Sequence, residues 1–129
     1  MGLFSKLFNN SSNVNEKIEL PWKSLNSIKQ LDDIKDKSRY KPQLIFKHST
    51  RCGISRMVLN TFVKQYNFTE NQADLYYLDL LAFRDVSNEV TTQFDVFHQS
   101  PQLLVIKNGA VVTHESHGAI NDMDLSQYV

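Results

Sequence analysis

The residue whose type and position best suit chemistry is Cys52, the single cysteine among 129 residues. It stands between the apolar, β-favouring run 43–48 and a helical pattern that opens at Gly53. A thiol at the start of a helix faces backbone N–H groups without intrahelical partners and the positive end of the helix dipole. Both favour the thiolate, which is the nucleophilic form of cysteine, and Arg51 adds a cation beside it. The position therefore predicts a reactive sulfur.

The sequence lacks a second cysteine at the position where a dithiol enzyme carries its resolving thiol. Three residues after Cys52 the chain has Ser55, which cannot form a disulfide. Cys52 can attack a mixed disulfide and keep the group that it removes, but an external thiol must then release that group. We expect Ser55 to be able to donate a hydrogen bond toward the thiolate. The pattern thus predicts a one-cysteine thiol–disulfide mechanism.

The composition argues against several other classes of function. Lys+Arg and Asp+Glu both number 14, so the formal net charge is +0, which disfavours nucleic-acid binding by bulk charge. One cysteine excludes an intrachain disulfide and fits a reducing, cytoplasmic location. No apolar run is long enough to span a membrane. His98, His114 and His117 lack metal-ligand spacing, so we expect no bound metal.

The elements that must position Cys52 follow from the periodicity of the apolar residues. We expect residues 1–16 to be a flexible or loosely docked segment and residues 17–129 to form a single domain. Strands are predicted over residues 18–22, 43–48, 73–80, 102–106 and 110–114, the last two joined by an Asn-Gly hairpin turn. Helices are predicted over residues 24–36, 52–66, 85–97 and 121–128, with Asp85 as the N-cap of the third.

This order, β-α-β-α-β-α-β-β-α, predicts an α/β fold with a mixed central sheet and helices on both faces. The first strands are joined through helices, which favours parallel crossovers, and the last two strands form an antiparallel hairpin. The thioredoxin-like fold has this order of elements.

Four short segments carry a resemblance to a known family. They are KHSTRCGIS at 47–55, RDVSN at 84–88, HQSPQ at 98–102 and KNG at 107–109. Together they resemble the YtxJ-like monothiol bacilliredoxins, a thioredoxin-fold family, from about residue 22 to residue 120. The resemblance implies removal of the small thiol bacillithiol from mixed disulfides with proteins. It also implies bacillithiol as co-substrate, S-bacillithiolated proteins as partners, and a recycling thiol or reductase.

In this family Cys52 would be the catalytic residue. Ser100-Pro101 falls on the family's cis-proline loop, which lies against the active-site turn in thioredoxin folds. His117-Gly118 follows the last strand, where fold relatives use a glycine near the cofactor end of the groove. The residues expected to contact the substrate are Thr50, Arg51, Gly53, Ser55, Ser100, Pro101, His117 and Gly118.

One position departs from the family pattern and leaves a second hypothesis open. The family reads Cys-Pro-Ile-Ser, whereas Gly53 follows Cys52 here. The motif is therefore also similar to the Cys-Gly-Phe-Ser of monothiol glutaredoxins, many of which hold an iron–sulfur cluster with a glutathione co-ligand. The alternative function is an iron–sulfur carrier that dimerises around a cluster ligated by Cys52 and a small thiol.

Overall fold

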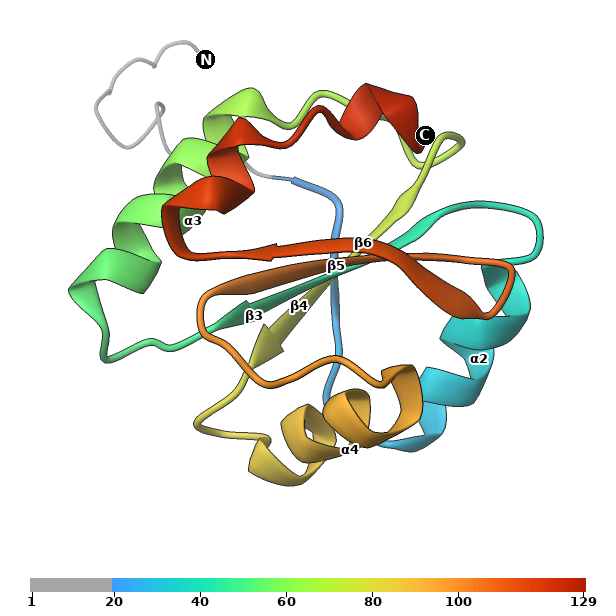
Figure 1. The fold of residues 1–129 in the computed structure, drawn as a ribbon, viewed down its shortest axis with the longest axis horizontal. Helices are drawn as coiled ribbons and strands as arrows, with labels where there is room; N and C mark the ends of the chain where they lie inside the picture. The colour runs from blue at the N-terminus through green and yellow to red at the C-terminus, as the bar shows by residue number, and fades with distance from the viewer. Residues whose placement is uncertain (1–19) are drawn as a thin grey trace, which may run out of the picture.

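The computed structural model describes residues 20–129, in which a five-stranded sheet lies between two layers of helix (Figure 1). The strands are β2 (Trp22–Ser24), β3 (Gln43–His48), β4 (Asp74–Asp79), β5 (Gln102–Lys107) and β6 (Ala110–Ser116). The α-helices are α2 (Lys29–Lys37), α3 (Gly53–Gln65) and α4 (Arg84–Phe94). The 3₁₀ helices η1 (His117–Asp122) and η2 (Leu125–Gln127) follow β6.

The strands lie side by side in the order β2-β4-β3-β5-β6. Strands β2 and β3 run parallel to β4, whereas β5 is antiparallel to β3 and β6 is antiparallel to β5. This arrangement confirms the predicted mixed sheet. The predicted boundary at residues 16–17 and part of the predicted strand 18–22 lie outside the described residues. Within the described residues, no helix is both long and apolar enough to cross a membrane.

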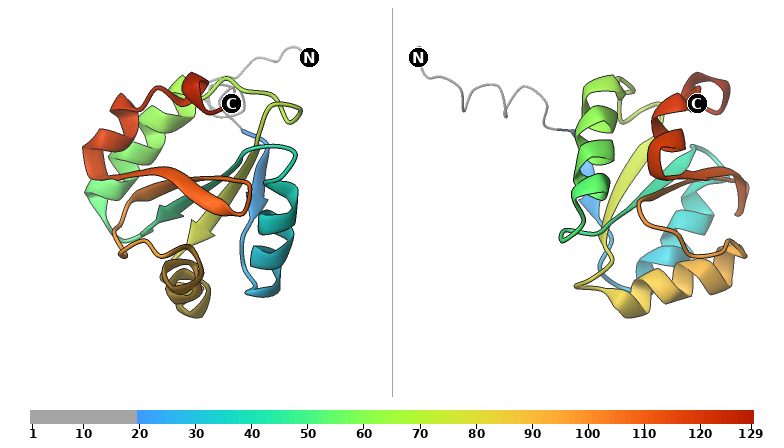
Figure 2. Two further views of the ribbon diagram at one scale, coloured as in Figure 1. Left: turned by 45° about the vertical axis from the view of Figure 1, so that its right-hand side comes forward. Right: turned by 60° about the vertical axis from the view of Figure 1, so that its left-hand side comes forward.

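Strand β3 is the centre of the molecule, and all six of its residues are buried. Successive side chains of a strand point to opposite faces of the sheet, so alternate residues of β3 enter two different cores. Leu44 and Phe46 pack toward α3, whereas Ile45 packs toward α2 and α4. The views in Figure 2 show α3 and the C-terminal 3₁₀ helices on one face and α2 and α4 on the other.

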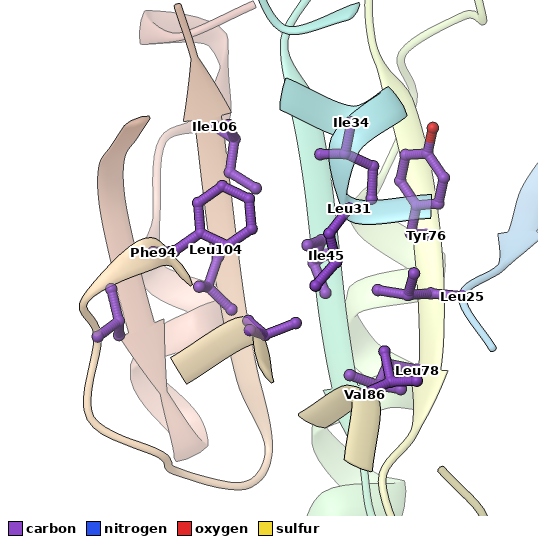
Figure 3. Packing of buried hydrophobic residues seen from close by; sticks show 12 residues of the cluster. Leu25, Leu31, Ile34, Ile45, Tyr76, Leu78, Val86, Phe94, Leu104 and Ile106 are labelled. Atoms are coloured by element: carbon purple, nitrogen blue, oxygen red, sulfur yellow. The ribbon is translucent and has the colours of Figure 1, made fainter. Parts of the chain in front are cut away.

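The core under α2 and α4 is mainly aliphatic. In Figure 3, side chains of the two helices interleave with those of the strands beneath them. Its fully or nearly fully buried members include Leu31, Ile34, Ile45, Leu78 and Val90. Each such side chain contributes about 1.5–3 kcal/mol through removal from water, so the two helices are fixed to the sheet mainly by packing.

The core under α3 is rich in aromatic rings. The ring of Phe46 lies 5.0 Å from that of Phe62 and 6.2 Å from that of Trp22, measured between centroids. Phe62 in turn lies 5.4 Å from Tyr66. These separations are typical of favourable edge and offset contacts between rings. Ile120 of η1 closes this core at the C-terminal side.

The start of α2 lies five residues later than residue 24, where the sequence predicted it. The side chain of Gln30 explains the delay, because its Oε1 accepts hydrogen bonds from the N–H groups of Asn26 and Ser27, at 2.8 and 3.0 Å. Its Nε2 also donates to the carbonyl of Ser24 at 2.8 Å. These bonds hold the chain in a turn before the helix, and they leave Ile28 40% exposed.

The predicted limits of α4 were also wrong. Phe83, not Asp85, occupies the N-cap position, and Asp85 lies in the first helical turn, where the helix dipole favours its carboxylate. The helix ends at Phe94 instead of residue 97, because Asp95 adopts the left-handed conformation with φ 55°. Asp is one of the residues that tolerates this conformation at a helix end.

The predicted last helix, over residues 121–128, is replaced by η1 and η2. Met123 between them is extended, with φ −72° and ψ 139°. Asp124 then accepts a hydrogen bond from the N–H of Ser126 at 3.2 Å. Short polar side chains such as Asp and Ser compete for backbone groups in this way, which explains why a continuous α-helix does not form.

The hairpin between β5 and β6 turns at Asn108 and Gly109, as the sequence predicted. Both residues have positive φ angles, 54° and 81°, which is the requirement of the tight hairpin turn that Asn-Gly favours. The turn is also attached to the end of α2. The N–H of Asn108 donates to the carbonyl of Ser38 at 2.8 Å, and that of Gly109 donates to Ser38 Oγ at 2.8 Å.

Candidate active site

Cys52 lies between β3 and α3, at the N-cap position of a 13-residue helix. Its backbone is extended, with φ −106° and ψ 121°, and its carbonyl accepts the N–H of Arg56 at 3.1 Å, as in the first turn of a helix. Its own N–H donates to the carbonyl of Ser49 at 3.2 Å. The thiol is half-buried, so it is accessible and lies at the positive end of α3.

Ser55, at the position of a resolving cysteine, is completely buried. Its Oγ lies 2.7 Å from Nδ1 of His48 and accepts the N–H of Ser49 at 3.2 Å. Within residues 20–129, no hydrogen bond joins Ser55 to Cys52, so its predicted bond to the thiolate stays a prediction. In the structure, the hydroxyl links the first turn of α3 to the end of β3 through these hydrogen bonds.

His48 is an uncharged partner in this contact near neutral pH. Burial lowers its pKa from the usual 6.5, and the positive charge of Arg56 lowers it further. The negative charge of Asp79 opposes these two effects without overcoming them. The contact between His48 and Ser55 is therefore a hydrogen bond between neutral groups inside the protein.

The second segment of the site leads into β5. The Ser100–Pro101 peptide bond is cis, as predicted. Pro101 directly precedes Gln102, which pairs with Lys47 of β3 at the end of the antiparallel ladder. The turn before α3 and the start of β5 lie at the same end of the sheet (Figure 1).

The third segment is the residue pair after β6. The N–H of His117 donates to the carbonyl of Pro101 at 3.0 Å, and His117 has a φ of 55°. Gly118 follows as an exposed residue of η1. Two of the three predicted segments, the cis-proline loop and the residues after β6, are thus joined directly, and both start or end strands at the end of the sheet that carries Cys52 (Figure 1).

A buried lysine near the cis-proline loop was missed in the sequence. Lys47 is fully buried, and its Nζ lies 3.3 Å from the carbonyl oxygen of Ser87, 3.4 Å from Oγ1 of Thr91 and 3.3 Å from Nδ1 of His98. Burial lowers the pKa of Lys47 from 10.5 to about 8. A lysine directly after the apolar residues 44–46 of the central strand is the sequence signal that could have identified it.

His98, on the other side of this contact, also has a lowered pKa. Burial is the main cause, and the positive charges of Lys47 and Arg84 add to it. A neutral His98 can accept a hydrogen bond from the ammonium group of Lys47. The pair therefore links β3 to the segment that carries Ser100 and Pro101.

An open groove lies between the turn that precedes Cys52 and the loop after β4. It is lined by Thr50, Arg51, Asp79, Leu81 and Ala82 and has a volume of about 380 Å³. Asp79 ends a strand parallel to β3, and loops at the carboxyl ends of parallel strands are common ligand sites. A second cavity of about 360 Å³ lies between α3 and the C-terminal segment and does not include the residues around Cys52.

In the described part of the chain, the possible metal ligands are scattered. Among residues 20–129, no three His, Cys, Asp or Glu side chains are grouped so that they could hold a metal ion. A cluster shared between two chains would use one cysteine from each, so this observation concerns only a site within a single chain.

Comparison with known proteins gives a consistent result. Residues 23–125 match the family model described as monothiol bacilliredoxin BrxC. A solved structure described as a putative oxidoreductase with a thioredoxin fold is similar to this chain, with 33% sequence identity and a TM-score of 0.69. The match covers 82% of this chain and 91% of that protein.

More distant structures share the fold. Thioredoxin from Malassezia sympodialis has 18% identity and a TM-score of 0.65, and the match covers 81% of this chain and 88% of that protein. Thioredoxin O2 from Arabidopsis thaliana has 17% identity and a TM-score of 0.63, with 83% and 93% of the two chains covered. The thioredoxin-like fold predicted from the sequence is confirmed.

Proposed function

We propose, since the chain belongs to the monothiol bacilliredoxin family, that it removes bacillithiol from mixed disulfides with proteins by attack of the Cys52 thiolate. Membership of this family and the thioredoxin-like oxidoreductase fold establish a thiol redox role. The observation that supports the finer proposal is the position of the half-buried Cys52 at the start of α3, with Ser55 in place of a second thiol. A bacillithiolated protein is the substrate class that this family implies.

The proposed reaction has two thiol–disulfide exchanges. In the first, the sulfur of Cys52 attacks the bacillithiol sulfur, a new S–S bond forms, and the bond to the client protein breaks. The client leaves as a thiolate and takes a proton from solvent. In the second, the thiolate of an external low-molecular-weight or protein thiol attacks the bacillithiol sulfur and releases Cys52 as a thiolate. The external thiol supplies the two electrons of the net reduction.

The residues around Cys52 have separate parts in this proposal. Thr50 and Arg51 form the turn before the nucleophile, and the carbonyl of Thr50 accepts a hydrogen bond from Arg56 at 3.0 Å. Gly53 is exposed, and apart from its chain neighbours and the nearby helix backbone no atom lies within 4 Å of where its Cβ would be. Ser55 acts as a positioning residue through His48.

The cis-proline side of the site would hold the client protein. Ser100 and Pro101 lead into β5, whose first residue pairs with Lys47, and the N–H of His117 donates to the carbonyl of Pro101. Gly118 is exposed and follows directly. We assign these four residues to contacts with the client chain on the β5 side of Cys52, in place of the cofactor contact that the resemblance implies for His117 and Gly118.

Intact-protein mass spectrometry tests the proposal directly. Reduced protein is mixed with a bacillithiolated client, and a glutathionylated client is treated in parallel. We expect Cys52 to gain the mass of one bacillithiol while the client loses it, and we expect no transfer to Cys52→Ser. Equal transfer of glutathione would show a general monothiol reductase, and transfer from neither client to a Cys52 that still reacts with an alkylating reagent would refute the proposal.

Gly53 after Cys52 favours one second candidate, the iron–sulfur carrier. That function requires visible absorption after anoxic purification or cluster reconstitution, and a dimer with one Cys52 from each chain. The mixed-disulfide proposal instead predicts a colourless protein under the same conditions. An absorption spectrum and a molecular mass in solution distinguish the two.

A further inference from the structure

The groove beside Cys52 contains two opposite charges and an apolar wall. One side is formed by Thr50 and Arg51, which immediately precede the nucleophile, and the other by Asp79, Leu81 and Ala82. The two sides face each other because His48 and Asp79 are paired at the carboxyl ends of β3 and β4. The volume of about 380 Å³ is within the range of about 300–1,000 Å³ for small-molecule sites.

The wall after β4 is held in a fixed shape by hydrogen bonds. Oδ1 of Asp79 accepts the N–H groups of Leu81 and Ala82, at 3.2 and 3.3 Å. The N–H of Leu80 donates to the carbonyl of His48 at 3.1 Å, and that of Phe83 donates to the carbonyl of Asp79 at 3.0 Å. The loop is therefore fixed to the strand that leads to Cys52.

The two charged groups of the groove, Asp79 and Arg51, each have atoms that can bind a ligand. Within residues 20–129, Oδ2 of Asp79 has no hydrogen-bond partner, since both bonds to its carboxylate use Oδ1. Arg51 is exposed, and neither of the two ion pairs found in the described part of the chain involves it. A guanidinium binds carboxylates well, and a carboxylate oxygen accepts hydrogen bonds from hydroxyl and ammonium groups.

We propose that this groove binds the small-thiol half of the mixed disulfide, with carboxylates of the thiol on Arg51 and its hydroxyl or ammonium groups on Asp79. This inference rests on the proposed function, because it assigns a binding site within that reaction. Bacillithiol carries both kinds of group, since it contains a malate, a sugar and a cysteinyl amine. The exposed Leu81 and Ala82 provide an apolar surface for the sugar ring.

The strand order supports separate binding sites for the small-thiol half and the protein half of the mixed disulfide. Strands β4 and β5 flank β3 on opposite sides. The groove is built on the β4 side, whereas the cis-proline loop and His117 are on the β5 side. A disulfide that crosses Cys52 can thus place its small thiol over Arg51 and Asp79 and its protein half against Pro101.

The test compares two substrates on the same client protein, one bearing bacillithiol and one bearing the uncharged thiol β-mercaptoethanol. For each enzyme we take the ratio of kcat/KM for the two substrates. Arg51→Gln should lower this ratio about tenfold, the loss of roughly one charge-assisted contact. Asp79→Asn should lower it about threefold to tenfold, and it keeps an acceptor oxygen for the N–H groups of Leu81 and Ala82.

Arg39→Gln is the matched control, because Arg39 is an exposed arginine beyond the end of α2 and lies outside the groove. Its ratio should equal that of the unmodified protein. If Arg51→Gln and Asp79→Asn both keep the ratio of the unmodified protein while bacillithiol is still transferred, the groove assignment is wrong and the proposed function stands. If the unmodified protein transfers no bacillithiol, the proposed function fails, and the groove assignment fails with it.

A binding measurement gives a second readout that does not depend on turnover. Cys52→Ser protein is titrated with reduced bacillithiol, and amide chemical shifts are followed by NMR. We expect the shifts to change at residues 50–51 and 79–82. Changes confined to residues 100–101 and 117–118 would place the small thiol on the β5 side and overturn the assignment.

Discussion

The side chains on the two faces of β3 make different contacts at the active-site end of the sheet. On the α3 face the strand ends in His48, which makes a 2.7 Å contact with Ser55. On the α4 face the last residue is Lys47, whose Nζ makes three contacts of 3.3–3.4 Å, to Ser87, Thr91 and His98. Adjacent residues of one strand thus support two different segments of the site.

The hydrophobic cores on the two faces of β3 also differ. The α3 face is packed with aromatic rings, among them Phe46 and Phe62 at 5.0 Å, whereas the α4 face is mainly aliphatic. The segment that carries the nucleophile is fixed by large rings and a short bond between neutral groups. The segment that carries the cis-proline is fixed by a buried ammonium group with longer contacts. The segment of the nucleophile is therefore supported by aromatic packing and a short polar contact, and that of the cis-proline by a buried charge.

The largest expected effect is on the aromatic face. Phe46→Ala should lower the free energy of unfolding by about 3–5 kcal/mol, because it removes a completely buried ring from the contacts with Phe62 and Trp22. Ile45→Val, on the other face of the same strand, should cost only about 0.5–1.5 kcal/mol. Urea unfolding measures both changes, and equal costs would contradict the difference expected from the sizes of the two deleted groups.

The next largest effect concerns the hydroxyl of Ser55, three residues after Cys52. Ser55→Ala leaves the N–H of Ser49 and a buried nitrogen of His48 without their partner, so it should lower the free energy of unfolding by about 1–3 kcal/mol. The matched control is Ser87→Ala, because Ser87 is also buried but its Oγ has no hydrogen-bond partner. Its cost should be within about 0.5 kcal/mol of zero. A similar cost for both variants would mean that the bond to His48 contributes little.

The third effect is a pH dependence on the α4 face. The pKa of Lys47 is about 8 in the folded protein and near 10.5 when it is exposed, so between these values the unfolded chain binds more protons and stability rises with pH. Lys47→Met removes this dependence. The stability of the unmodified protein relative to Lys47→Met should rise by about 1–2 kcal/mol from pH 7 to pH 10, once solvent screening is allowed for. A difference that stays constant over this range would show that Lys47 is not desolvated.

The smallest expected effect is a pH dependence of stability that arises from His48 on the α3 face. The pKa of His48 is below 6.5 in the folded protein, so the unfolded chain binds more protons below this pH, and stability falls as the solution is acidified. NMR titration of the imidazole should give a midpoint below 6.5. A midpoint at or above 6.5 would indicate that Asp79 outweighs burial and that the contact with Ser55 is charged.

Much of the fold could be predicted because local signals agreed with tertiary packing. The strand 43–48 was predicted with its observed limits, and Asn108–Gly109 gave the expected turn. Helix ends were predicted less well, since they depend on side chains such as Gln30 that bond to backbone groups several residues away. Periodicity contains no information on such bonds.

The site could be predicted where residues adjacent in sequence act together. Cys52 at a helix start was visible in the sequence, and the resemblance identified the cis-proline. The contact of Lys47 with His98 and the place of Asp79 opposite Arg51 were missed, because strand register and chain reversal bring these residues together. Their spacing along the chain gives no sign of it.

The attachment of the hairpin turn to Ser38 has a consequence for amide hydrogen exchange. A tight turn at the tip of a hairpin normally exchanges its amide protons quickly, because they point into water. Here the amides of Asn108 and Gly109 are bonded to Ser38 at the end of α2, far away in the sequence, and only separation of the two elements can expose them. Exchange at this tip therefore reports on separation of the C-terminal hairpin from the end of α2.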